Sequence, residues 1–259
     1  MNELQDIVNF EHYPINNSAF QDKCFNRIRD KSVLILKNFI NKKCLNNIQK
    51  EALLLEKKAF YCSKKHTVLL KKKNKNIIYD DPLNIEVISD KGCVPHDLIN
   101  ADSYLNQLYN SFIFKNFLKK VLGIKYIYPY KDKLSSINYN YYQNSQQLGW
   151  HFDNASFAIT LMIQSPDNGG VFEYLVKGRD YNKNYIDKDL IKKVLDNKIK
   201  SKELFVSPGT LILFYGRNYL HRVTPVTSIK SRILVTLNYN EEKNIELSEN
   251  ARLTFFGRV

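Results

Sequence analysis

Three side chains that could share a metal ion lie in the second half of the chain. His151 and Asp153 are separated by one residue, and His221 lies in a segment far downstream. Alternate side chains of a β-strand point to the same side, so His151 and Asp153 can face one point while Phe152 turns away. Two imidazoles and one carboxylate form the facial ligand set of non-haem iron sites, which leaves positions open for substrates. The pattern predicts an Fe(II) centre made by His151, Asp153 and His221.

A His-x-Asp pair alone is a weak signal, because such pairs often form ordinary hydrogen bonds. The surrounding segments strengthen it. Ser207-Pro208-Gly209-Thr210-Leu211 opens a later β-rich run, and His221 is followed by Arg222-Val223-Thr224-Pro225. Arg232 then precedes an apolar run. An arginine there can form a bidentate, charge-assisted pair with a carboxylate, so we expect Arg232 to bind a carboxylate ligand near the metal.

The elements that would position these residues are short β-rich runs separated by Gly, Pro and Asn turns. They are expected over residues 134–143, 156–164, 170–175, 204–206, 210–215, 220–225 and 231–239. One helix, over about 186–197, interrupts them. Such runs are typical of a sandwich or barrel. Helices packed on one side of a double-stranded β-helix, or jelly roll, fit this order.

The N-terminal half is expected to be mainly helical. The sequence predicts helices over 19–30 with Ser18 as cap, over 42–59 with Asn41 as cap, and over 95–121, the longest. Gly123 is a plausible C-cap for the last. A short buried strand is predicted over 33–36, after an irregular arm over 1–18. Residues 61–95, with a possible strand at 77–79, are expected to form a mobile or substrate-facing insertion.

Length and composition are consistent with a single domain over residues 1–259, with a mainly helical part to about 125 and a β-rich core with a C-terminal tail after it. Four cysteines without a C-x-x-C pair argue against structural zinc and suit a reducing compartment, so we expect a cytoplasmic protein. The sequence shows no signal-peptide pattern and no apolar run of about 18 residues, so no membrane partner is expected.

The formal net charge of +13 could serve a nucleic acid, an anionic surface or an acidic substrate. The lysines are spread along the chain, however, and a compositional bias explains that spread better. The densest run comprises Lys64-Lys65 and Lys71-Lys72-Lys73-Asn74-Lys75, which a solvated loop would explain without a partner. A nucleic-acid partner is therefore not favoured, although the charge leaves it open.

The order H-x-D, P-G-T, H-R-V-x-P and R-I resembles the Fe(II)/2-oxoglutarate-dependent dioxygenases over about residues 125–258. More narrowly, the segments 148–154, 169–174, 216–218 and 255–258 are similar to the BesD-like amino-acid halogenases and hydroxylases. The resemblance implies an α+β fold with a cupin-like jelly-roll core. It also implies Fe(II) as cofactor and 2-oxoglutarate and O₂ as cosubstrates, with Arg232 holding the distal carboxylate of 2-oxoglutarate.

Two positions depart from the halogenases of this branch. Those halogenases carry a small residue, usually Gly, in place of the metal-binding carboxylate, which frees a site for chloride. The chain has Asp153 there, so the resemblance implies a hydroxylase, a desaturase or a related oxygenase. Asn154 stands where lysine-using relatives carry an acidic residue that engages the substrate amine, which speaks against free lysine. The resemblance places further substrate contacts at Thr236, Asn238, Phe255 and Phe256, the last two as part of a lid.

Several assignments stay open from the sequence. Asn138, Tyr139 and Tyr141 alternate on the run leading to the iron ligands; one of them, with Tyr139 as our candidate, can meet the cosubstrate, and a packed aromatic strand is equally compatible. Trp150 is either a substrate wall or core filler. Gly169-Gly170 indicates a hairpin turn before a strand. Further along, Glu173 would be a substrate contact or solvated.

Three functions therefore compete. The first is 2-oxoglutarate-dependent hydroxylation of a small molecule, such as an amino acid or a derivative. The second is the same chemistry on a protein or a nucleic acid, motivated by the positive charge and the 61–95 insertion. The third is a jelly-roll binding module without turnover. An enclosed pocket would favour a metabolite, whereas an open basic groove would favour a polymer; the oligomeric state is not indicated by the sequence.

Overall fold

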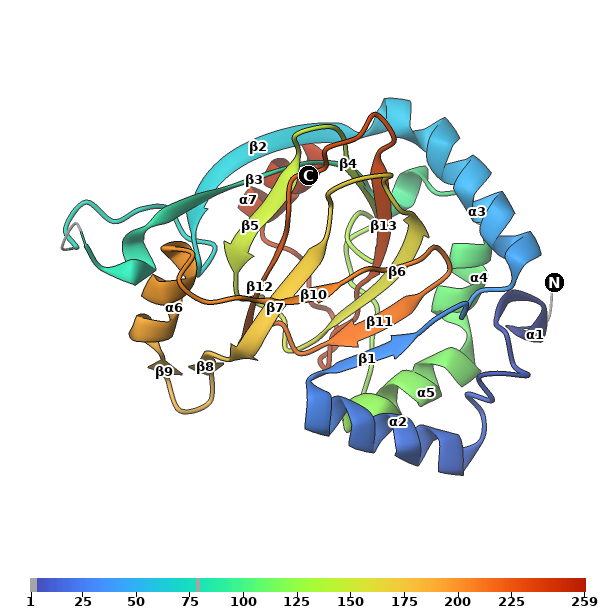
Figure 1. Ribbon diagram of the computed structural model, residues 1–259. Coiled ribbons are helices and arrows are strands. Elements are labelled where there is room, and N and C mark those ends of the chain that lie inside the picture. The colour runs from blue at the N-terminus through green and yellow to red at the C-terminus, as the bar shows by residue number, and fades with distance from the viewer. Residues whose placement is uncertain (1–3, 78–79) are drawn as a thin grey trace.

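The computed structural model describes residues 4–77 and 80–259 of the chain. Its centre is one curled antiparallel sheet with helices packed around it (Figure 1). The strands are β1 (Val33–Leu36), β2 (Phe60–Thr67), β3 (Glu86–Val94), β4 (Ile137–Tyr142), β5 (Gln147–His151), β6 (Ala158–Gln164), β7 (Phe172–Lys177), β10 (Lys202–Leu204), β11 (Leu211–Phe214), β12 (Tyr219–Val223) and β13 (Arg232–Leu237). β8 (Arg179–Asp180) and β9 (Tyr185–Ile186) form a separate pair.

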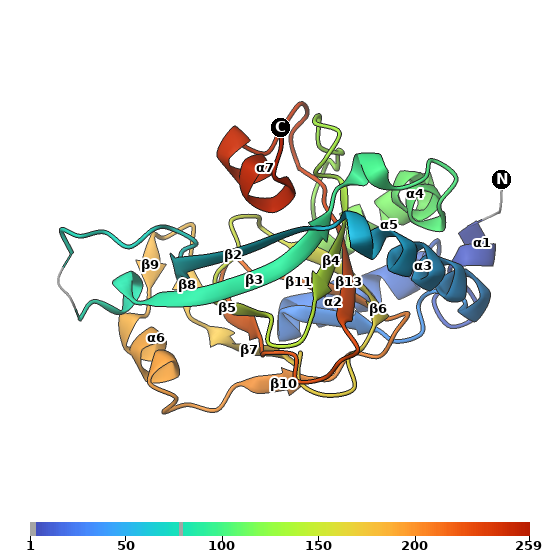
Figure 2. The same cartoon turned by 90° about the horizontal axis from the view of Figure 1, so that it is seen from above.

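The sheet folds into two layers that face each other. One layer has the order β1-β11-β6-β13-β4, and the other has the order β5-β12-β7-β10. β3 joins them, because it pairs with β4 near Gly92 and with β5 near Ser89. β2 pairs with β3 along its whole length, and the two strands form a long hairpin that extends beyond the layers (Figure 2). This arrangement is the jelly-roll core, and it confirms the expected fold class.

Five helices lie on the outer face of the first layer. They are α1 (Leu4–Ile7), α2 (Ser18–Lys31), α3 (Lys42–Leu55), α4 (Tyr104–Asn110) and α5 (Phe112–Leu122). The main core lies between them and the sheet. The odd-numbered residues of β4, β6 and β13 face this core, among them Tyr139, Tyr141 and Val235, all 0% exposed. Because side chains alternate along a strand, the even-numbered residues face the inside of the jelly roll.

Two helices lie elsewhere. α6 (Lys188–Leu195) packs Ile191 and Val194 against Trp150, Phe152 and other side chains on the outer face of the second layer. α7 (Glu249–Phe256) packs on β2 and β3 (Figure 2). No helix among the described residues is long and apolar enough to cross a membrane.

The helix boundaries corrected several expectations. Asn17, not Ser18, caps α2, because its side chain accepts a hydrogen bond from the Phe20 amide. Asn41 precedes α3 without capping it: its side-chain amide donates instead to backbone carbonyls of the N-terminal arm, including that of Val8. That arm contains the short helix α1, and a 3₁₀ turn over Glu56–Lys58 follows α3.

The single long helix expected over 95–121 was wrong. A 3₁₀ turn (His96–Leu98), α4 and α5 replace it. Ser103 and Ser111 each accept an amide hydrogen bond at the start of α4 and α5, so each serine begins a new helix. Gly123 ends α5 in the left-handed conformation, with φ of 67°, and this part of the prediction is confirmed.

Residues 61–95 are also more regular than expected. Both ends of this segment belong to the strands of the β2–β3 hairpin, whose register runs from Phe60 opposite Cys93 to Thr67 opposite Glu86. The expected strand at 77–79 is not seen at Ile77, and residues 78–79 lie outside the described part of the chain. Three strands thus come from the part expected to be mainly helical.

The segment 169–170 is not the turn of a β-hairpin. Both glycines have positive φ, 70° and 60°, as a tight turn requires. The strands on either side, however, belong to different layers: β6 pairs with β11 and β13, whereas β7 pairs with β12 and β10. The segment therefore carries the chain from one layer to the other.

Candidate metal centre and its cavity

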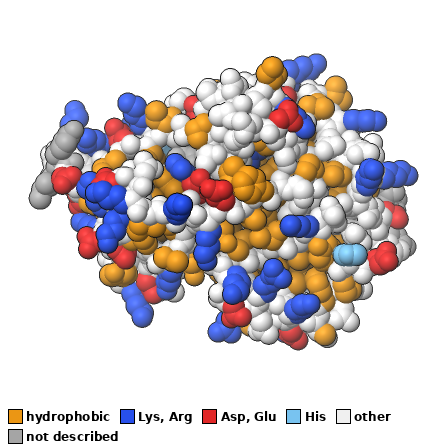
Figure 3. All heavy atoms as spheres, in the orientation of Figure 1, with side chains coloured by type: hydrophobic (Ala, Val, Ile, Leu, Met, Phe, Trp, Pro, Cys, Tyr) orange, Lys and Arg blue, Asp and Glu red, His pale blue; other side chains and the backbone are white. Residues whose placement is uncertain are grey.

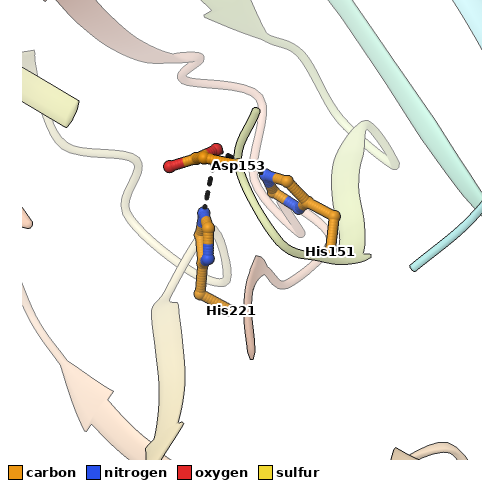
Figure 4. A group of neighbouring side chains, drawn as sticks. All are labelled: His151, Asp153 and His221. Carbon is orange, nitrogen blue, oxygen red and sulfur yellow. Dashed lines mark ion pairs between the residues drawn. The ribbon is translucent and has the colours of Figure 1, made fainter. Parts of the chain in front are cut away.

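The structure brings His151, Asp153 and His221 together at one end of the second layer (Figure 4). His151 ends β5 and lies directly opposite His221 of β12 in the register. The Asp153 Oδ1 atom lies 3.4 Å from His151 Nε2 and 3.5 Å from His221 Nε2. One ligand atom of each residue lies within 4.8 Å of the others, which suits a single metal ion.

Each histidine is oriented by a hydrogen bond from its other ring nitrogen. His151 Nδ1 lies 2.8 Å from the carbonyl oxygen of Gly149, and His221 Nδ1 lies 2.9 Å from that of Tyr219. A carbonyl oxygen can only accept, so each Nδ1 carries the proton and each Nε2 keeps a lone pair for a metal. Burial, followed by the proximity of His221, lowers the pKa of His151, which favours the neutral ligand form.

Asp153 is held by Gly216, in the turn before β12. The Asp153 amide donates to the Gly216 carbonyl oxygen at 3.0 Å. A Cβ atom on Gly216 would overlap the Asp153 carboxylate and lie 2.9 Å from His221 Cε1, so only glycine leaves room here. Burial raises the pKa of Asp153, but His221 and then His151 outweigh that effect, and the pKa lies well below its usual range. Asp153 is therefore a carboxylate anion, the form that can bind a metal ion.

A cavity of about 890 Å³ opens in front of these three residues, between the layers. Its walls come from even-numbered positions of β4, β6, β11 and β13, as the strand alternation requires, and from β2, β3, β5, β7, β12 and α7. Phe172 and Phe214 pack on His221 with ring centroids 5.7 Å and 5.0 Å away. The apolar part of the lining includes Leu70, Leu148, Ala158, Phe172, Ile212, Phe214, Val223, Leu234, Ala251 and Phe255.

Arg232 is a buried cation that faces the same cavity. It begins β13, lies opposite Tyr142 of β4, and is 2% exposed. Its Nε and Nη1 atoms have no hydrogen-bond partner in the described structure, and its guanidinium carbon lies 5.2 Å from the Tyr142 ring centroid. Burial lowers the pKa of Arg232. An unpaired buried guanidinium is costly, so its donors fit an anionic ligand that enters the cavity.

These observations fit both implied groups. The nitrogen and oxygen donors of His151, Asp153 and His221 suit Fe(II) and cover one face of it. The free donors of Arg232 suit the distal carboxylate of 2-oxoglutarate. The structure therefore places three potential metal ligands and a buried cation with unpaired donors on the walls of one cavity.

The predicted substrate contacts divide into two sets. Asn154 and Thr236 line the cavity, as does Phe255 of α7. Asn238 lies behind the wall, and its side-chain amide donates to Ser135, Asn138 and Thr236. Phe256 also departs from the expectation, because it is buried in a small cluster with Cys93 and Leu134.

Tyr139 and Trp150 lie on outer faces of the sheet, away from the cavity. The Tyr139 hydroxyl donates to Glu51 of α3 at 2.7 Å, so the cosubstrate role expected for Tyr139 is corrected. Trp150 packs in the cluster under α6, with the Arg222 guanidinium 4.7 Å from its ring centroid, and is therefore core filler. Tyr139 alternates on β4 with Asn140 and Tyr142, which face the cavity, and Trp150 precedes the cavity-facing His151 on β5.

Sequence reasoning missed several cavity residues. Asn140 and Tyr142 face the cavity from β4, one position away from the tyrosines that we considered. His66 is not one of the three potential metal ligands but lines the cavity, with its ring centroid 6.4 Å from that of His151. Only the β2–β3 pairing brings it there. Glu173, finally, is buried and accepts from Arg222 Nε at 2.8 Å, so it is neither a substrate contact nor solvated.

Comparisons with known proteins agree with this geometry. The model of the Halogenase D family matches residues 16–254 of the chain. No curated protein sequence matches significantly.

Solved structures with the same fold share little sequence with the chain. A Burkholderia pseudomallei oxidoreductase of the 2OG-Fe(II) oxygenase family has 12% identity and a TM-score of 0.53, covering 89% of this chain and 95% of its own. The epimerase SnoN from nogalamycin biosynthesis, described as non-haem and α-ketoglutarate-dependent, has 9% identity and a TM-score of 0.57, with 86% and 83% covered. A Trichoplax adhaerens prolyl hydroxylase, solved with a peptide, has 15% identity and a TM-score of 0.56, with 89% and 92% covered.

The likeness to these structures supports the fold, and the family match covers most of the chain. The expected resemblance to the BesD-like branch agrees with the halogenase description of the family. The chain belongs to the Halogenase D family and is an Fe(II)/2-oxoglutarate-dependent oxygenase.

Proposed function

We propose that this oxygenase hydroxylates a C–H bond of a small molecule, such as an amino acid or a derivative. The observation that carries the proposal is Asp153, which supplies a carboxylate to the metal cluster where a halogenase would leave room for chloride. The cavity supports a small substrate, because about 890 Å³ lies within the range of small-molecule sites. Four free cysteines among the described residues support the expected cytoplasmic location.

The residues of the chain would divide the work as follows. His151, Asp153 and His221 would hold Fe(II), and Arg232 would bind the distal carboxylate of 2-oxoglutarate. The bound iron, with 2-oxoglutarate and O₂, would supply the oxidising power for the C–H bond. Phe172, Phe214 and the other apolar lining residues would keep water from the reacting atoms.

Polar residues that line the cavity would position the substrate. Asn154 follows Asp153 in the sequence and lines the cavity, and Thr236 lines the cavity from β13. The Asn154 backbone is fixed by Arg217, whose Nε and Nη2 atoms donate to its carbonyl oxygen at 3.0 Å and 2.6 Å. Phe255 faces them from α7, which packs across β2 and β3 as a lid would.

A metabolite library incubated with Fe(II) and 2-oxoglutarate tests the proposal. We expect one component to gain one oxygen atom in step with succinate formation, and we expect the His221→Ala variant to show neither change. A product that gains chlorine in the presence of chloride would contradict hydroxylation. Turnover of a protein or a nucleic acid with no metabolite turned over would contradict the small-molecule assignment.

A further inference from the structure

Five lysines line the cavity on the side of the β2–β3 hairpin. They are Lys64 and Lys65 of β2, Lys91 of β3, and Lys71 and Lys72 in the loop after β2. Asp153 is the one carboxylate among the described lining residues. This imbalance differs from the outer surface: on the face shown in Figure 3, basic side chains are scattered and acidic ones lie among them.

The two lysines whose contacts are defined have neutral partners. Lys64 Nζ donates to the Thr254 hydroxyl at 2.6 Å. Lys91 Nζ donates to the Asn140 side-chain oxygen and lies 5.5 Å from the Phe255 ring centroid. Lysines elsewhere in the described chain do find carboxylates, as Lys188 does with Asp81 at 2.7 Å. The charges of Lys64 and Lys91 are therefore held in the cavity without being neutralised there.

Iron and 2-oxoglutarate would not neutralise these lysines. In the proposed site, the two positive charges of Fe(II) and the one of Arg232 offset the two carboxylates of 2-oxoglutarate and the one of Asp153. The lysine charges are left over, so an anionic second ligand is the partner that would balance them. A cationic substrate, such as a free basic amino acid, would be repelled.

The strand register places these cations at a defined distance from the metal cluster. His66 and Ser89 lie level with the cluster, because Ser89 Oγ accepts from the Gly149 amide and the His66 ring centroid is 6.4 Å from that of His151. Lys64 lies two residues beyond His66 on the same face of β2, directly opposite Ser89, and Lys91 lies two residues beyond Ser89 on the same face of β3. Two residues of strand span roughly 7 Å. An anion held there would leave the other end of its molecule beside the iron.

We propose that the cavity selects a small molecule bearing a phosphate group, with Lys64 and Lys91 binding the phosphate. Lysine binds phosphate as a compact point charge, and several lysines together suit its multiple negative charges. The inference rests on the proposed function and narrows its substrate class. The cavity favours a small molecule over a polymer, because α7 and the β2–β3 hairpin form walls on either side of it and its volume fits a metabolite.

Binding of inorganic pyrophosphate to the metal-free full chain tests the inference without relying on turnover. Calorimetry would compare the natural chain with the double variant Lys64→Gln/Lys91→Gln. The matched control is Lys23→Gln/Lys31→Gln, which removes the same charge from exposed lysines on α2. Arg232 is intact in all three proteins. We expect the cavity variant to bind pyrophosphate about tenfold more weakly or worse, and the control to match the natural chain.

Equal loss in both double variants would overturn the inference, since it would show a response to overall charge alone. A chain with no saturable pyrophosphate binding at physiological salt would overturn it as well. Tighter binding of a single-stranded oligonucleotide than of pyrophosphate, weakened by the same two substitutions, would assign the lysines to a polymer. Failure of succinate formation would instead count against the proposed function, because the calorimetric result does not depend on iron or 2-oxoglutarate.

Discussion

Gly216 lies directly against the carboxylate of Asp153. A Cβ atom at position 216 would be 2.6 Å from the Asp153 carboxyl carbon and 2.9 Å from His221 Cε1. The close approach positions the Asp153 carboxylate, and the Asp153 amide donates to the carbonyl oxygen of the same glycine. The arrangement of His151, Asp153 and His221 therefore depends on a residue that has no side chain.

Gly216→Ala should weaken Fe(II) binding by about ten- to hundredfold, because the added methyl group displaces the Asp153 side chain. Gly178→Ala is the matched control: its added Cβ would lie 3.1 Å from the flexible Leu190 side chain and at an ordinary contact distance of 3.5 Å from the Phe152 ring, on the outer face of the second layer. Anaerobic Fe(II) titration of the two variants measures the difference. Unchanged iron affinity in Gly216→Ala would show that Asp153 is not held as a ligand in this way.

Arg232→Met should have opposite effects on stability and on cosubstrate affinity. The guanidinium is buried with two nitrogen atoms unpaired, so its replacement removes an uncompensated charge and should leave the free energy of unfolding of the ligand-free chain unchanged or higher by about 1–4 kcal/mol. The KM for 2-oxoglutarate should rise at least tenfold, because a charge-assisted pair is lost. Urea unfolding and steady-state kinetics check the two effects. A rise in KM no larger than that of Arg29→Ala, a distant control on α2, would move the anchor elsewhere.

Tyr139→Phe separates a structural tyrosine from a cavity tyrosine. The hydroxyl of Tyr139 donates to Glu51, which also accepts from Ser103, so its loss should cost about 1–2 kcal/mol of unfolding free energy and leave the 2-oxoglutarate KM unchanged. Tyr142→Phe, on the opposite face of β4 and beside Arg232, is the matched change. It should alter KM instead. The reverse pattern would restore Tyr139 as a cosubstrate residue.

Ser89→Ala should loosen the link between the β2–β3 hairpin and the metal cluster. His66 Nδ1 donates to the Thr67 carbonyl oxygen, so Ser89 must donate to His66 Nε2 while accepting from the Gly149 amide. Gly149 in turn orients His151. We expect several-fold weaker Fe(II) binding, measured by titration, because the support of one ligand is disturbed. Ser63→Ala, at an exposed position of β2, should have no effect; equal iron affinity in both variants would refute the link.

The metal ligands could be predicted from sequence because the signal is local for two of them. The spacing of His151 and Asp153 shows that both can face one point, and the segment around His221 resembles a known pattern. The jelly roll followed from the succession of short strands. In this respect the chemistry of the site and the class of the fold were both accessible without coordinates.

The rest of the cavity depends on pairing between distant segments, which sequence periodicity does not reveal. The lysine-rich β2 becomes a cavity wall only through its register with β3. The cavity-facing side of β4 was assigned wrongly because tyrosines lie on both faces of this strand. Tyr139 faces the main core and Tyr142 faces the cavity, yet the two look alike in sequence. The serines that divide 95–121 into separate helices are weaker signals than the apolar pattern that runs through them.

The central claim is that His151, Asp153 and His221 bind one Fe(II) beside 2-oxoglutarate. Its most direct test is an anaerobic titration of Fe(II) into the full chain with 2-oxoglutarate present, followed by the visible charge-transfer absorption of the complex. We expect one iron per chain, with an absorption band that needs both additions and is lost in His221→Ala. The same band at the same stoichiometry in His221→Ala would contradict the account.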